Sequence, residues 1–144
     1  MEVSDTIVTK KRSIEDEHKH HEELVNGIAQ QLKPILDSSE QPIMIYLDDM
    51  HKTCNKKFAN LFGYSSPKAW SKTESNFVET FIDEESRDTV VNNYHDVIVE
   101  KLSASVISAK IKKKSGETAE MTMIHVPVTY NGHLFAVGFI SEVK

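Results

Sequence analysis

The chain has 144 residues, of which 39% are hydrophobic and 27% are charged, as expected for one globular domain with a modest extension. Its formal charge of −5 argues against a nucleic-acid partner, because surfaces that bind phosphate backbones are usually strongly basic. A single cysteine, Cys54, excludes an internal disulfide and any multi-cysteine metal site within one chain.

The sequence also carries no sign of a membrane segment. Its N-terminus lacks an apolar run of signal-peptide length, and no stretch approaches the roughly 20 apolar residues of a membrane helix. Together with the lone cysteine, this favours a reducing, cytoplasmic location without a membrane partner.

The first part of the chain predicts a helix behind a short tail. Residues 1–12 are polar and aperiodic, and we expect them to be flexible. Ser13 has the character of an N-cap, and a helix is predicted over residues 13–39, with a kink or restart near Lys33 because Pro34 cannot continue the helix. One stripe of this helix has the spacing of a heptad repeat, which favours pairing with a second copy. The predicted homodimer interface consists of Ile14, His18, His21, Val25, Ile28 and Leu32.

Two members of this stripe, His18 and His21, are titratable near neutral pH. In a parallel dimer, equivalent imidazoles would lie close together, and protonation near the ordinary pKa of about 6.5 would place like charges at the interface. Three hypotheses follow: pairing weakens below about pH 6, a divalent metal bridges the two helices, or the helix frays before His21.

The sequence of residues 40–144 predicts a separate domain that contains both strands and helices. The first half contains a strand at 43–47 with a short partner near Thr53, then a helix over 56–62 between the cap Asn55 and the stop Gly63. Short helical pieces are expected over 64–81, and a longer helix over 83–101.

The second half predicts three antiparallel strands, at 106–111, 121–130 and 134–140. Asn131-Gly132 favours a type I′ turn between the last two, and Pro127 should lie at an edge or a bulge. Both strands beside this turn are apolar at consecutive positions, so both faces of the sheet should be covered. The central helices would cover one face, and either the N-terminal helix or a second chain would cover the other.

Several short motifs occur here in the order typical of one family. Asn55, Phe58, Phe62-Gly63-Tyr64-Ser65, Phe81-Ile82-Asp83, Lys113-Lys114-Ser115-Gly116 and the final glycines Gly132 and Gly138 together resemble the PAS family over about residues 35–143. The resemblance implies an α+β fold: a five-stranded antiparallel sheet with short helices and one longer helix on one face, preceded here by the N-terminal amphipathic helix. It also implies a sensory role, with a ligand pocket between the helices and the concave sheet.

From this resemblance and from strand alternation we predict a PAS sensory and interaction domain in signal transduction or transcriptional regulation. It would bind a small ligand, dimerise through its N-terminal helix and outer sheet face, and contact a kinase or another regulator. A ligand-free interaction module is the alternative. The predicted pocket residues are Ile45, Leu47, Phe58, Phe62, Trp70, Phe77, Tyr94, Ile107, Met123, His125 and Phe135.

Three sharper hypotheses concern a flavin, a heme and a catalytic role. A flavin adduct of the light-oxygen-voltage type is not expected, because Ser75-Asn76-Phe77 lacks the cysteine of the comparable motif and Cys54 precedes the helix. His95 is the candidate axial ligand of a heme, although the helical pattern leaves it at the margin of the buried face. No catalytic motif is recognised, so an enzyme is not expected, and no metal site or catalytic residue is assigned; a small lyase or isomerase is the remaining enzymatic reading.

Overall fold

The computed structural model describes the backbone of residues 2–142 and the side chains of residues 14–142. Within these residues, five strands form one antiparallel sheet in the order β2-β1-β5-β4-β3. The fold therefore confirms the predicted five-stranded sheet. Its strands are β1 (Ile43–Asp48), β2 (His51–Cys54), β3 (Ser105–Lys112), β4 (Thr118–Tyr130) and β5 (His133–Glu142).

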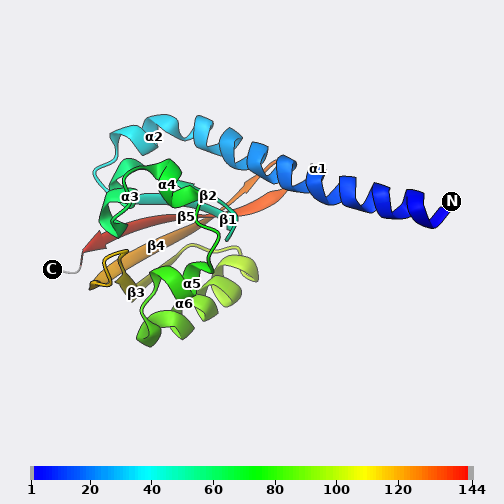
Figure 1. Ribbon diagram of the computed structural model, residues 1–144. Coiled ribbons are helices and arrows are strands. Elements are labelled where there is room, and N and C mark those ends of the chain that lie inside the picture. Colours follow the sequence, from blue (N-terminus) through cyan, green and yellow to red (C-terminus); the bar gives the residue numbers. More distant parts are fainter. Residues whose placement is uncertain (1, 143–144) are drawn as a thin grey trace.

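The connection between β2 and β3 covers the inner, concave face of the sheet with helices (Figure 1). The segment predicted as one longer helix begins with a 3-10 turn and ends in a π-helical turn, so its last part is wound more loosely than a regular α-helix. The helices are α3 (Lys56–Phe62), α4 (Pro67–Ser71), α5 (Phe77–Phe81), η1 (Glu84–Ser86), α6 (Arg87–Asn93) and the π-helical η2 (Tyr94–Val99).

The N-terminal helix α1 (Glu2–Gln31) begins earlier than predicted, and the expected flexible tail is instead helical. The segment before Ser13 contains no glycine or proline that would stop a helix, so helical backbone continues through Ser13. The predicted restart near Lys33 is confirmed, because α2 (Lys33–Ser38) follows α1 with Pro34 in its first turn. None of the helices in residues 2–142 combines the length and apolar character needed to cross a bilayer.

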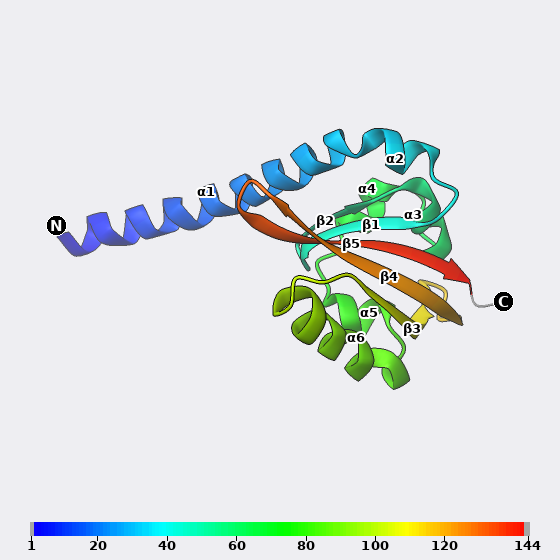
Figure 2. The same ribbon diagram turned by 180° about the vertical axis from the view of Figure 1, so that it is seen from behind.

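The second half of α1 covers the outer face of the sheet, while its first half projects beyond the sheet (Figures 1 and 2). Leu24, Val25 and Ile28 are buried against the strands, with the outward side chains of β1 and β5 beneath them. The sequence predicted that either the N-terminal helix or a second chain covers this face, and the structure shows the N-terminal helix there. The cluster on this face contains Leu24, Val25, Ile28, Ile43, Ile45, Phe135 and Val137.

Gly27 lets α1 approach the sheet closely. A Cβ atom at this position would lie 2.6 Å from the Tyr130 hydroxyl oxygen, which is closer than side-chain carbons come to other atoms. A residue that weakens an isolated helix is therefore used here for packing.

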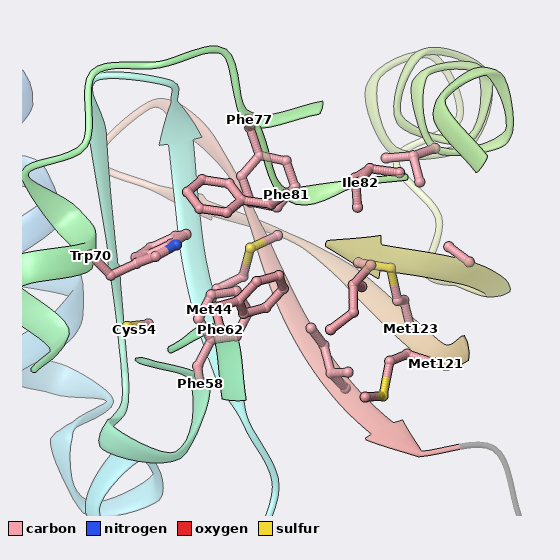
Figure 3. Close-up of a cluster of buried hydrophobic side chains, with 14 of the residues drawn as sticks. Met44, Cys54, Phe58, Phe62, Trp70, Phe77, Phe81, Ile82, Met121 and Met123 are labelled. Carbon is pink, nitrogen blue, oxygen red and sulfur yellow. The ribbon is translucent and has the colours of Figure 1, made fainter. Parts of the chain in front are cut away.

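The inner face holds the larger core, built around an aromatic group (Figure 3). Phe58, Phe62 and Trp70 are fully buried, and their rings contact one another at centroid distances of 4.7 and 4.8 Å. Such tilted and edge-to-face pairs add to the stabilisation from apolar burial. These rings fill the β2 side of the concave face, so any space for a ligand lies elsewhere.

The helix cap, the helix stop and the hairpin turn that were predicted from the sequence are all present. The Asn55 Oδ1 atom accepts hydrogen bonds from the backbone N–H groups of Phe58 and Ile43, both at 3.0 Å, which caps α3 and fixes it to β1. Gly63 ends α3 with a φ of 90°, and Asn131 and Gly132 adopt positive φ in the turn between β4 and β5. Pro127 lies past the last residue of β4 that pairs with β3, so it is at an edge.

Candidate functional site

A cavity of about 210 Å³ lies on the inner face, between the sheet and the helical segment from α5 to η2. Three strands form its floor, through Met44 and Tyr46 of β1, His125 of β4 and Ala136 of β5. Helical residues form its walls and roof, so the cavity occupies the half of the concave face that the aromatic core leaves free. The helical lining residues are Phe77, Val78, Val90, Val91, Asn93, Tyr94, His95 and Ile98.

The β1–β2 turn fixes one wall of the cavity through the half-buried carboxylate of Asp49. The Tyr46 hydroxyl donates to Asp49 Oδ1 at 2.7 Å, and the Phe77 backbone N–H donates to the same oxygen at 3.0 Å. Lys52 is 3% exposed and donates from Nζ to the backbone carbonyls of Asp49 and Thr73. These bonds hold the start of α5 against β1, and they orient the Tyr46 ring at the cavity.

Burial disfavours the charged form of three titratable groups that line the cavity. Burial, with a smaller contribution from the hydrogen bond to Asp49, raises the pKa of Tyr46, and burial also raises the pKa of Tyr94. His125 is 8% exposed, and burial lowers its pKa to about 4. A site that holds its polar groups neutral offers hydrogen bonds to an uncharged ligand rather than proton transfer near pH 7.

The structure brings together three of the eleven residues predicted for the pocket: Phe77, Tyr94 and His125. Ile45, Leu47 and Phe135 lie on the other face, in or against the cluster beneath α1, because their strands present the alternate residues to the concave side. The other five belong to the solid core or pack against it: Phe58, Phe62, Trp70, Ile107 and Met123.

Sequence reasoning missed Met44, Tyr46 and Ala136 as lining residues. Each lies in a predicted strand, directly beside a residue that was assigned to the pocket. Since both faces of the sheet are apolar, hydrophobicity does not distinguish the inward residues from the outward ones. For β5, however, a signal was present: the two-residue turn fixes the pairing of β4 and β5 and places Ala136 on the face that His125 occupies.

The two cofactors considered from the sequence do not fit this cavity. Pockets that enclose ligands of drug size measure roughly 300–1,000 Å³, and a flavin or a heme is at least that large, whereas this cavity measures about 210 Å³. Cys54 lies in the aromatic core, where burial raises the pKa of its thiol to about 12 and leaves it unreactive. His95 lines the cavity, but its side chain is exposed.

The residues predicted for a dimer interface divide along α1. Val25 and Ile28 are buried in the chain's own outer cluster, and Leu32 packs against it, so these three are not free to face a partner helix. Ile14 is 61% exposed on the projecting half. His18 and His21 instead lie beside His51 of the same chain.

Comparisons with known proteins establish the fold. None of the models of known protein families matches the chain, and no curated protein is detectably similar in sequence. Among solved structures, the PAS domain of a protein from Colwellia psychrerythraea aligns with a TM-score of 0.64 at 14% identity, covering 81% of this chain and 97% of that one. The chain therefore has the PAS fold.

Two further solved structures show the same likeness in fold. The PAS domain of BvgS from Bordetella pertussis aligns with a TM-score of 0.58 at 15% identity, covering 82% of this chain and 88% of that one. The PAS domain of a LuxR-family transcriptional regulator from Burkholderia thailandensis, in complex with ethanol, aligns with a TM-score of 0.59 at 11% identity and covers 77% and 96% of the two chains. At these identities the likeness concerns the fold alone.

Proposed function

We propose that this chain is a sensory PAS domain of a signalling protein and that it binds a small, uncharged molecule in the concave cavity. The observation that carries the proposal is the cavity itself: apolar walls surround a few polar groups, and burial disfavours the charged forms of Tyr94 and His125 among them. Its volume of about 210 Å³ favours a ligand of a few heavy atoms. The regulator domain from Burkholderia thailandensis, which has the same fold, is in complex with ethanol and supports a ligand of this size.

The helical side of the cavity supports a route from ligand to signal. The π-helical segment η2 contributes Tyr94, His95 and Ile98 to the lining, and π-helical turns are common at functional sites. A ligand that contacts both η2 and the sheet changes the packing between them. Because α1 lies on the opposite face of β1 and β5, a shift of these strands reaches α1 directly.

Filling the cavity tests the proposal. Titration of the full chain with ethanol and then with longer alcohols, followed by NMR, should shift the methyl signals of Met44 and Ile98. Ala136→Leu places three more carbon atoms in the cavity and should abolish these shifts. Val106→Leu adds a methylene at a position that is 67% exposed and should leave them unchanged. Equal shifts in Ala136→Leu would contradict the proposed site, and no shift with any alcohol would favour the ligand-free interaction module.

We further propose that the projecting half of α1 pairs with the same segment of a second copy. Residues 14–17 of this half are all exposed, and Ile14 continues the heptad stripe with 61% of its surface accessible. The native mass of the full chain, measured by light scattering, should correspond to two chains, and Ile14→Asp should shift it toward one. A single-chain mass for the unmodified protein would contradict this pairing.

A further inference from the structure

Five of the seven histidines gather outside the cavity, where the middle of α1 passes the β1–β2 turn and the tip of the β4–β5 hairpin (Figures 1 and 2). Neighbouring imidazole rings in this group have centroids 4.7 to 6.0 Å apart. Three helix residues therefore meet side chains from two different strands. The members are His18, His20 and His21 of α1, His51 of β2 and His133 of β5.

From this group we infer a binding site for a transition-metal ion of the zinc type, with His21, Asp48 and His51 as its ligands. One ligand atom from each of these residues lies within 4.8 Å of the other two. Two imidazoles and one carboxylate are a donor set that zinc accepts, and water fills the fourth position in such three-residue sites. The inference is independent of the small-molecule cavity, which shares none of these residues.

His51 is the fixed member of the site. Its side chain is 8% exposed, and its Nδ1 atom lies 2.7 Å from Asp48 Oδ1, which accepts a hydrogen bond from it when no metal is bound. With zinc–ligand bonds of about 2.0–2.2 Å, ligand atoms in a tetrahedral site lie about 3.3 Å apart. The carboxylate and the imidazole therefore already have nearly the spacing they need. His21 is half-buried, and its ligand atom lies within 4.8 Å of those of Asp48 and His51.

The other nitrogen of His51 has the partner that a metal-bound histidine needs. His51 Nε2 lies 2.8 Å from His18 Nδ1, and His18 Nε2 lies 3.3 Å from Glu22 Oε1. Histidines that bind a metal through one nitrogen usually donate a hydrogen bond from the other, which fixes the ring orientation. In the metal-bound form, His51 would donate to His18, and His18 would donate to Glu22.

The two hydrogen bonds of His51 need two N–H hydrogens, which two neutral imidazole rings carry: His51 Nδ1–H donates to Asp48 and His18 Nδ1–H donates to His51 Nε2. A metal ion between Asp48 and His51 would replace the first hydrogen and reverse the direction of the second bond. His21 supplies a further nitrogen lone pair at that end, as a metal site needs.

Such an ion would fasten α1 to the β1–β2 turn. His21 belongs to α1, whereas Asp48 and His51 are paired residues of β1 and β2, so the ion would link the outer helix to the sheet edge. Since an ion that binds only the folded state stabilises it, zinc should raise the melting temperature and protect the backbone amides of α1 from hydrogen exchange.

Zinc titration of the full chain tests the site. We expect one Zn²⁺ per chain by calorimetry, and Co²⁺ should give the visible absorption of a tetrahedral complex. His21→Ala and Asp48→Asn should each weaken binding by more than about 100-fold, because each removes a ligand. His18→Gln should weaken it by about 10-fold, the loss typical of an orienting partner. His95→Ala removes an exposed histidine outside the group and should leave zinc affinity unchanged.

The inference would be overturned by no zinc binding, by equal zinc affinity in His21→Ala and His95→Ala, or by one ion per two chains. Retention of zinc by a folded His51→Ala variant would likewise show that the α1 histidines bind the ion without the sheet. His21 and Asp48 are partly exposed, so their variants should keep the fold, which circular dichroism checks.

Discussion

Replacing Ile28 with alanine should lower the free energy of unfolding by about 3 kcal/mol, as expected for truncating a fully buried isoleucine. Ile28 is 2% exposed, and it packs from α1 against the sheet in one cluster with Ile43, Ile45 and Phe135. Truncation removes three carbon atoms from this contact and leaves a space that the rigid sheet cannot close. Urea unfolding followed by circular dichroism measures the change.

Ile35→Ala provides the matched control, because Ile35 is also helical but 52% exposed. Its effect should stay within about 0.5 kcal/mol. If Ile28→Ala were equally mild, α1 would not be docked on the sheet in solution, and the outer face would need another cover. The comparison therefore tests the route from the cavity through the sheet to α1.

The parts of the fold that depend on local chemistry could be predicted from the sequence. Asn55 before an apolar turn, Gly63 after it and Asn131-Gly132 between two strands each fix the backbone through their own side chain or their positive φ. Prediction succeeded there because the deciding interactions span only a few residues. The start of α1 was predicted too late, because a cap at Ser13 was inferred where no residue stops the helix.

The cavity could be predicted only in part, because it depends on which face each strand presents. In a sheet covered on both sides, the apolar pattern of a strand does not show which of its two faces points inward. For β1, Ile45 and Leu47 were predicted to point inward, but Met44 and Tyr46 do. For β5, the turn at Asn131-Gly132 fixes the pairing with β4 and so determines which residues point inward.

Counting back from that turn pairs Phe135 with Val128 and His125 with Gly138. Directly paired residues share a face, and Val128 is an odd number of positions from His125. Phe135 and His125 therefore lie on opposite faces, and the two could not both line one pocket.

The histidine group could not be predicted, because it depends on how α1 lies on the sheet. His18 and His51 are 33 residues apart, and the heptad spacing of α1 describes one face of a helix without identifying what covers that face. The pattern was assigned to a second helix, whereas the stripe around Val25 and Ile28 faces the chain's own strands. A helix with one apolar stripe predicts a partner surface but does not reveal whether that surface belongs to the same chain.

His125 should make the domain sensitive to acid. Its pKa is about 4 in the folded state and 6.5 when exposed, so between these values the unfolded chain binds more protons than the folded one. The free energy of unfolding should therefore fall as the pH decreases from about 6.5 to about 4. The difference between the two pKa values corresponds to a loss of about 3 kcal/mol from this residue alone.

Urea unfolding from pH 7 to pH 4 measures this loss, and His125→Leu should remove it while keeping a side chain of similar size at the cavity floor. The carboxylates and the other histidines contribute to the pH profile of both proteins, so the quantity to compare is the difference between the two profiles. His95→Ala should retain the dependence of the unmodified protein, because that side chain is exposed. Parallel profiles for His125→Leu and the unmodified chain would mean that His125 opens to water in solution, and the cavity floor would then be wet rather than apolar.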